Sequence, residues 1–263
     1  LLGPRPANRR MMIMVTLPGE AANDPAIIER LVENGMNCAR INCAHDSPEE
    51  WQKMIEYVRK AAHKFQKPLK VSMDLGGPKI RTHSLSGSTK DKKGNSYIPI
   101  RQGNTILLGK DLEAFPDKKH HGVTLTYPKI LHSLKRGERI FFDDGKIEGK
   151  IITAPLNEIA EVEITKCKPD GARLKADKGI NFPDSQLGIA GLTEKDKVDF
   201  DFISKHADIV NFSFVNTVED LNELFSLIDK YNAHNLGIIL KIETKRAYNN
   251  LWSLLIETMK RSN

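Results

Sequence analysis

Polar side chains stand at the carboxyl ends of five apolar segments that predict β-strands. A buried parallel strand is expected to be an almost continuous run of Val, Ile and Leu. Two pairs of these polar residues are spaced i, i+2, so each pair points to one side of its strand. In a barrel of parallel strands these ends meet at the mouth, and the pattern therefore predicts one convergent site. The residues are Thr16, Arg40, Asn42, Asp74, Ser213, Lys241 and Glu243.

The types of these side chains indicate chemistry on a phosphorylated substrate. Arg40, Arg81 and Lys241 are cations that suit phosphate, since arginine offers a planar fork of donors and lysine a point charge. Glu243 is a hard oxygen ligand that suits Mg²⁺ shared with a substrate. Cations and carboxylates around a metal are used in phosphoryl transfer, and they also stabilise an enolate. Both reaction classes stay open on the residues alone.

Alternating strands and helices are predicted for the two ends of the chain. Such alternation is typical of βαβ units and a parallel sheet, and five strand–helix units can be counted. Capping residues mark the helix starts, as at Asp24-Pro25, Ser47-Pro48 and Thr193. The predicted elements are strands Met11–Leu17, Met36–Asn42, Leu69–Leu75, Asp208–Phe214 and Gly237–Ile242, and helices Pro25–Gly35, Ser47–Phe65, Thr193–His206, Thr217–Tyr231 and Arg246–Lys260.

The central hundred residues show no helical period and consist of short strand-like runs between Gly and Asp turns. They predict a small antiparallel β-barrel inserted into the alternating part. Ser86–Ser96, which is polar and rich in lysine, is predicted to be a mobile loop. The predicted fold is α/β: an incomplete (β/α)₈ TIM-type barrel formed by residues 1–83 and 185–263, with an inserted all-β lid domain at 84–184.

Composition narrows the class of protein. The 263 residues are 40% apolar and carry 40 basic and 34 acidic side chains, a net charge of +6 that suits anionic substrates without requiring nucleic acid. The lysines are not interleaved with stacking aromatics, so RNA binding is the least favoured function. No apolar run approaches the ~20 residues of a membrane span. Cys38, Cys43 and Cys167 lack metal spacing and suit a reducing compartment, so we expect a cytoplasmic protein.

Six motifs in order give the sequence a resemblance to the pyruvate kinase family. GMNCARINCAH at 35–45 is similar to the family's GMNVARLNFSH, and MDLGGPKIRT at 73–82 to its LDTKGPEIRT. The other four, FDDG at 142–145, KGINFP at 178–183, LTEKD at 192–196 and LKIE at 240–243, resemble VDDG, KGVNLP, VSEKD and SKIE. Any one motif alone would be weak evidence, but together they span nearly the whole chain.

The resemblance implies a glycolytic reaction, phosphoenolpyruvate plus ADP giving pyruvate plus ATP, and a role for each matched residue. Arg40 and Lys241 would be catalytic, and Glu243 would bind Mg²⁺ or Mn²⁺. The phosphorylated substrate would be held by Arg40, Arg81, Ser213 and Lys241, and the nucleotide by Asn42, His45, Arg81, Lys178 and Asp144 on the lid. The full-length protein is expected to be a homo-oligomer without nucleic-acid or membrane partners.

Structural readings of some of these residues stay open. His45 is equally expected as a hydrogen-bonded structural residue, Lys178-Gly179 as a turn, and Asp143-Asp144-Gly145 as a hairpin turn.

Three residues depart from the family's monovalent-cation site. Asn42 and Asp74 remain, but Ala44 and Leu75 replace two oxygen ligands, and Lys79 stands where the family commonly has Glu. Two unit charges ~4 Å apart repel by about 4 kcal/mol at an effective dielectric of 20. We therefore expect the Lys79 ammonium to replace K⁺, so that K⁺ is not required.

The chain stops at about the point where the family's second metal carboxylate would follow, in a strand ending ARGDLG. An open barrel would leave an unpaired strand edge, so we expect a segment of a longer chain. Two alternatives remain open: another Mg²⁺–enolate barrel enzyme of the pyruvate aldolase or lyase type, and a non-catalytic pyruvate kinase relative.

Overall fold

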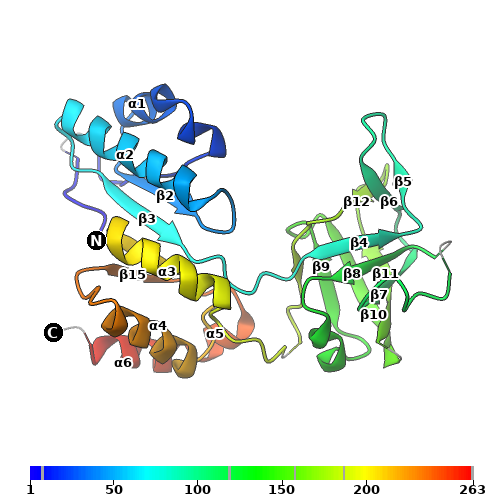
Figure 1. Cartoon of the computed structure of the whole chain (residues 1–263). Coiled ribbons are helices and arrows are strands. Elements are labelled where there is room, and N and C mark those ends of the chain that lie inside the picture. The colour runs from blue at the N-terminus through cyan, green and yellow to red at the C-terminus, as the bar shows by residue number, and fades with distance from the viewer. Residues whose placement is uncertain (7–8, 118–119, 157, 186, 262–263) are drawn as a thin grey trace. The chain divides into compact units, whose positions relative to one another are not determined.

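The computed structural model describes residues 1–6, 9–117, 120–156, 158–185 and 187–261. The chain forms two compact units, Leu1–Pro78 with Ala190–Asn263, and Lys79–Ile189 (Figure 1). The first unit is α/β and the second is built almost entirely of strands. Within the described ranges, no helix has both the length and the apolar composition needed to cross a membrane.

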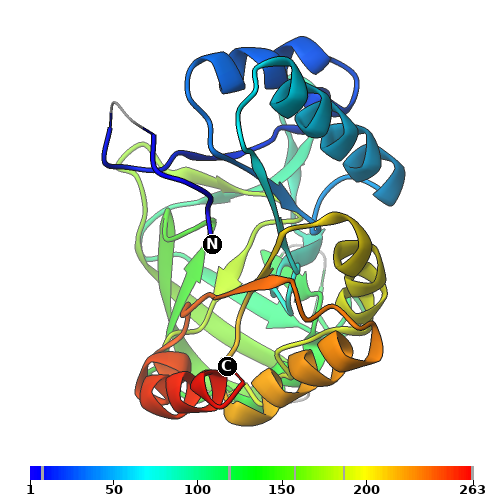
Figure 2. The same ribbon diagram turned by 90° about the vertical axis from the view of Figure 1, so that its left-hand side faces the viewer.

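A five-stranded, fully parallel sheet forms the centre of the first unit, in the order β1-β2-β3-β14-β15. All five carboxyl ends therefore lie along one edge of this sheet. Figure 2 shows the helices following one another around its outer side in chain order. The strands are β1 (Met14–Thr16), β2 (Cys38–Asn42), β3 (Lys70–Asp74), β14 (Ile209–Phe212) and β15 (Gly237–Leu240).

Side-chain caps start the helices of this unit where the sequence predicts them. Asp24 accepts a hydrogen bond from the backbone of Ala26, and Ser47, Thr193 and Thr217 form capping boxes. The apolar faces of the helices then pack on the sheet around fully buried residues such as Trp51, Met54 and Phe200. The elements are η1 (Gly19–Ala22), α1 (Pro25–Glu33), α2 (Pro48–Lys64), α3 (Glu194–His206), α4 (Val218–Lys230), α5 (Lys245–Asn249) and α6 (Leu251–Met259).

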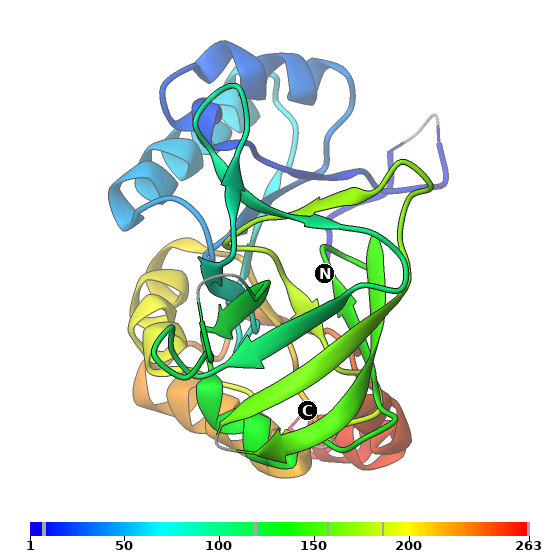
Figure 3. The same cartoon turned by 90° about the vertical axis from the view of Figure 1, so that its right-hand side faces the viewer.

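The second unit is a β-barrel (Figure 3). Its seven-stranded sheet has the order β13-β9-β10-β11-β7-β8-β4, and a three-stranded sheet, β12-β6-β5, accompanies it. The edge strands β4 and β13 meet where Thr82 N–H bonds Lys178 O and Ile180 N–H bonds Ile80 O, which closes the sheet. The strands are β4 (Thr82–Ser86), β5 (Thr89–Lys90), β6 (Ser96–Ile100), β7 (Thr105–Gly109), β8 (Gly122–Leu125), β9 (Arg139–Phe142), β10 (Ile147–Leu156), β11 (Ile159–Lys166), β12 (Ala172–Leu174) and β13 (Ile180–Asn181), and η2 (Pro128–Ser133) is a 3₁₀ helix.

Two predictions within this barrel are wrong. One neighbouring pair, β7 and β8, runs parallel, because the connection between them is about a dozen residues long and can cross over. Ser86–Ser96 is not simply a loop, since β5 pairs with β6 as a hairpin. The Asp91 carboxylate accepts hydrogen bonds from the backbone N–H groups of Lys93 and Asn95, which fixes the turn.

The prediction of one continuous helix at the end of the chain is also wrong. Arg246–Lys260 is two helices, α5 and α6, separated at Asn250. The Asn250 side chain donates a hydrogen bond to the backbone carbonyl of Asn216, 2.8 Å away. This tertiary contact lies at the break, and the apolar periodicity of the segment does not reveal it.

Candidate active site

The carboxyl edge of the parallel sheet gathers polar side chains from four neighbouring segments. In the strand register, Asn42 and Asn211 lie on either side of Asp74. Ser213 and Lys241 follow directly after β14 and β15. The structure brings together Arg40, Asp74, Ser213, Lys241 and Glu243, which the sequence predicted to converge.

Asp74 lies at the centre of this cluster and is 1% exposed. Arg40 grips its carboxylate with two donors, Nε at 2.9 Å from Oδ1 and Nη2 at 2.5 Å from Oδ2. Lys241 Nζ lies 3.2 Å from Oδ2, and the Asn211 amide donates to Oδ1. Burial alone would raise the pKa of the Asp74 carboxyl, but the hydrogen bonds from Arg40 and Asn211 and the charge of Lys241 hold that pKa below its usual value.

Lys241 links Asp74 to the loops after β14 and β15. Its Nζ donates to Ser213 Oγ at 2.9 Å and lies 3.0 Å from Glu243 Oε1. The other carboxylate oxygen of Glu243 accepts the backbone N–H of Phe214 at 3.0 Å. Phe214 has φ of +58°, a costly conformation for an aromatic residue, and such strain is concentrated at functional sites.

Arg40 and Lys241 are accessible to solvent, whereas the Asp74 carboxylate that both contact is buried. The side chains of Arg40 and Lys241 are 30% and 26% exposed, against 2% for Asp74. Arg40 is also steadied by Nη1 donating to Thr16 Oγ1 at 2.9 Å. A hydrogen bond to Asp74 raises the pKa of Arg40 further. The edge therefore presents two fixed positive charges that an anion can reach.

Sequence comparisons agree with this geometry. The family described as "Pyruvate kinase, barrel domain" matches residues 8–260. Pyruvate kinases of Staphylococcus aureus strains USA300, NCTC 8325 / PS 47 and COL are 30% identical over 249 residues, which cover 94% of this chain. The chain belongs to the pyruvate kinase family. It spans 40% of the length of these curated relatives.

Two residues that the pyruvate kinase resemblance assigns to the nucleotide, Asn42 and His45, lie at the last position of β2 and in the loop that follows. Asn42 Oδ1 accepts the Ala44 backbone N–H at 3.1 Å and so stabilises the turn. His45 is exposed, and its backbone carbonyl accepts the indole N–H of Trp51 at 2.9 Å. The His45 backbone thus has a structural contact, while its imidazole faces solvent.

Three residues that the resemblance assigns to the nucleotide, Arg81, Lys178 and Asp144, belong to the second unit and lie near Gly179, as does the departing residue Lys79. Arg81 Nη1 donates to Asp177 O at 3.1 Å, and Lys178 Nζ lies 3.2 Å from Asp143. Lys79 Nζ lies 3.9 Å from Asp144 Oδ1, a weak ion pair with an exposed partner. The predicted nucleotide site and the predicted replacement of K⁺ by Lys79 combine residues of both units and stay predictions.

Asn211 is the site residue that sequence reasoning missed. It is 3% exposed and contacts Asp74, and it interrupts the otherwise apolar strand Ile209–Phe212. A polar residue in the middle of a buried strand was the available signal. The contribution of the Phe214 backbone was also missed, since a positive φ leaves no mark in the sequence.

A magnesium ion shared with substrate suits the donor set of this site. Within the described ranges, no three His, Cys, Asp or Glu side chains form a metal-binding group. Asp74 is buried and already accepts three hydrogen bonds and pairs with Lys241, which leaves Glu243 as the carboxylate for a metal. Mg²⁺ commonly binds through one or two carboxylates and completes its shell with water and substrate oxygens. The residues therefore fit such an ion.

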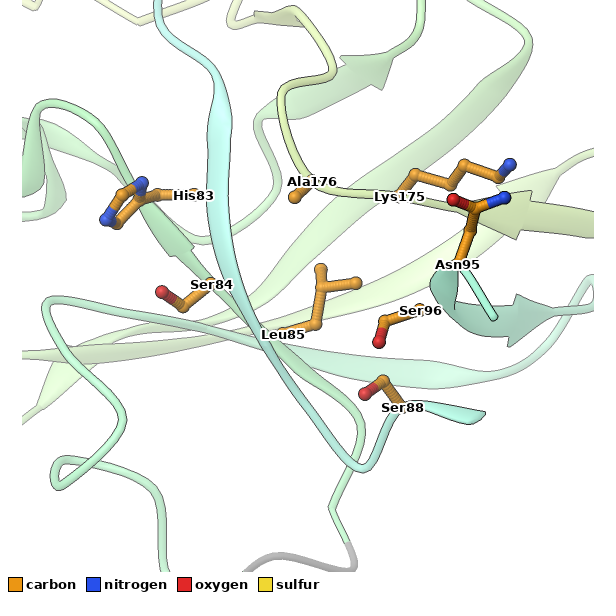
Figure 4. A pocket seen from close by; sticks show the side chains of 8 residues that line it. All are labelled: His83, Ser84, Leu85, Ser88, Asn95, Ser96, Lys175 and Ala176. Atoms are coloured by element: carbon orange, nitrogen blue, oxygen red, sulfur yellow. The ribbon is translucent and has the colours of Figure 1, made fainter. Parts of the chain in front are cut away.

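A separate hollow of about 550 Å³ lies on the second unit and contains none of the predicted site residues. In Figure 4 its polar side chains do not converge, since His83 points away from Lys175 and Asn95. Lys175 and Asn95 both contact Asp91, which belongs to the hairpin turn. The arrangement favours a surface recess beside the hairpin over a binding site.

Proposed function

We propose that this chain carries the phosphoenolpyruvate-binding part of a pyruvate kinase, which transfers the phosphoryl group of phosphoenolpyruvate to ADP. The observation that supports this most is the Asp74 carboxylate holding Arg40 and Lys241 side by side at the carboxyl edge of a parallel sheet. In open α/β sheets and barrels, ligands bind at this edge. Family membership supplies the reaction class.

Arg40 and Lys241 each stabilise a different negatively charged group during the reaction. The two Arg40 N–H groups that are not used on Asp74 and Thr16 would hold the transferring phosphoryl group. Lys241 would neutralise the enolate oxygen that develops as the P–O bond breaks. Both are held in place before substrate arrives, so little reorganisation is needed during the reaction. Ser213 keeps the Lys241 ammonium on the same side as Asp74.

Glu243 would hold Mg²⁺ or Mn²⁺ together with oxygens of the substrate. The metal would act as a Lewis acid on the substrate oxygens. The hydrogen bond from Phe214 N–H orients one oxygen of Glu243. The other oxygen of Glu243 forms an ion pair with Lys241. This ion pair would rearrange when metal and substrate bind, because the metal and Lys241 would then both contact the negatively charged substrate.

Asn42, His45, Arg81, Lys178 and Asp144 are proposed to face the nucleotide phosphates. In this proposal the second unit acts as a lid that helps exclude water, and residues 1–83 and 185–263 form part of a TIM-type barrel around the insertion 84–184. Lys79 would take the place of a monovalent cation near Asn42 and Asp74. We further propose that the full-length protein is a cytoplasmic homo-oligomer acting in glycolysis.

The test is Lys241→Met in the full-length protein, with Lys245→Met as the matched control. Lys245 is exposed and starts α5, only four residues from Lys241. We expect Lys241→Met to lower kcat for pyruvate formation by about a thousandfold, the size expected for loss of one transition-state charge partner. Mg²⁺ affinity should fall only modestly, and Lys245→Met should behave as the unchanged protein.

Three results would contradict the proposal. Unchanged kcat in Lys241→Met would remove the role assigned to this lysine. Pyruvate formation or cleavage that needs no nucleotide would favour the aldolase or lyase alternative. Phosphoenolpyruvate binding without turnover in the full-length protein would favour a non-catalytic relative.

A further inference from the structure

A buried hydrogen-bond chain, Ser72–Asn211–Asp74, crosses from β3 to β14 directly beneath the cations. Ser72 Oγ donates to Asn211 Oδ1 at 3.0 Å, and Asn211 Nδ2 donates to Asp74 Oδ1. All three residues are 3% exposed or less. The orientation of the amide is determined by its neighbours, since a carboxylate accepts only and the reversed amide would face it with an oxygen.

Asn211 supplies one of the four donors that surround the Asp74 carboxylate. Arg40 supplies two and Lys241 the fourth. The Asp74 carboxylate thus accepts three hydrogen bonds and forms one ion pair, and it has about four lone-pair sites for these partners. Arg40 and Lys241 have long, partly exposed side chains, whereas Asn211 is short, buried and fixed on a strand. Asn211 is therefore the rigid donor among the four.

We propose that Asn211 is a positioning residue for the anion-binding cations. It fixes the plane of the Asp74 carboxylate, and that plane sets the direction of the Arg40 guanidinium and of the Lys241 ammonium. Without this donor the carboxylate is free to turn about its Cβ–Cγ bond, and Arg40 and Lys241, which contact it, lose their shared alignment. The inference deepens the proposed function and rests on it for the identity of the anion.

The test compares Asn211→Leu with Val210→Ala. Leucine is close to asparagine in size but has no donor, so Asp74 loses only the amide. Val210 is the adjacent residue of β14, is fully buried in the hydrophobic core and, by strand alternation, points to the opposite face of the sheet from Asn211, so Val210→Ala controls for general destabilisation. Thermal unfolding of both variants is measured first.

Two readouts then separate positioning from a structural role. The first is the exchange with water of the Arg40 Nε–H proton, followed by ¹⁵N NMR without ligand. The second is the Kd of phosphoenolpyruvate with Mg²⁺, measured by calorimetry. For Asn211→Leu we expect faster exchange and binding about tenfold weaker, the scale of one charge-assisted hydrogen bond. Val210→Ala should change neither by more than about twofold.

Each outcome decides a different claim. Unchanged Arg40 exchange in Asn211→Leu overturns the positioning role, whatever the ligand data show. Equal weakening of binding by both variants also overturns it. Failure of the unchanged protein to bind phosphoenolpyruvate overturns the proposed function, while the NMR comparison still decides the role of Asn211. If the leucine variant does not fold, Asn211→Val is used, since valine suits a strand and also has no donor, and its Arg40 exchange must again exceed that of the unchanged protein.

Discussion

Replacing Asp74 with Asn should destabilise the α/β unit far more than the same change at another buried aspartate. Asp74 accepts three hydrogen bonds, two of them from Arg40, and pairs with Lys241, and the replacement puts an amide N–H against cations that remain. Removing one member of a buried ion pair costs 3–5 kcal/mol, and partial exposure of both cations favours the low end, about 3 kcal/mol. With a urea m value of about 2 kcal/mol/M, the midpoint should fall by ~1.5 M.

Asp199→Asn is the matched control. Asp199 is 6% exposed, in the same unit, and its ion-pair partner is Lys195, whose side chain is 61% exposed. Burial raises the pKa of the Asp199 carboxyl, and the hydrogen bond from Lys195 only partly opposes it. Because burial disfavours the charged form of Asp199, replacing its carboxylate with a neutral amide removes little stabilising free energy. Asp199→Asn should therefore leave the stability of the protein unchanged or raise it slightly.

The pH dependence gives an independent check. The folded-state pKa of Asp74 lies below its unfolded value, so its stabilising contribution is fully present above the unfolded pKa of about 3.9. It is lost as the pH falls through the folded pKa. The difference in urea midpoint between the unchanged protein and Asp74→Asn, measured by circular dichroism, should therefore become smaller at acid pH. Equal midpoint shifts for the two asparagine variants at pH 7 would refute the account of Asp74.

Three further predictions concern other parts of the chain. If the Lys79 ammonium takes the place of the monovalent cation, as proposed, turnover of the full-length protein should be the same in Na⁺ and K⁺; a strict K⁺ requirement in steady-state assays would contradict this. Ellman's reagent should modify Cys167 in the native protein but spare Cys38 and Cys43, since both are buried and burial raises the pKa of Cys38 to about 11 and that of Cys43 further; three fast-reacting thiols would be the opposing result. Gly77→Ala should cost about 2 kcal/mol in urea unfolding, because φ is +67° and the new Cβ would lie 2.6 Å from an aromatic carbon; an unchanged midpoint would show that the loop relaxes freely.

Local chemistry accounts for the parts of the fold that the sequence predicted well. Caps at Asp24, Ser47, Thr193 and Thr217 determine the helix starts, because each side chain satisfies backbone N–H groups of the first turn. The wrong predictions concern elements whose structure depends on contacts between residues distant in the sequence. The Asn250 break depends on a carbonyl 34 residues away, and the parallel β7–β8 pair depends on how a crossover packs.

The sequence alone determined that polar residues end the parallel strands, because period-two patterning and strand direction are local properties. It also determined family membership, since the motifs are read directly from the chain. Only the tertiary structure decided that Asp74 is the shared partner of Arg40, Lys241 and Asn211. Strand order and register set that meeting, and the pairing of β3 with β14 joins residues more than a hundred positions apart.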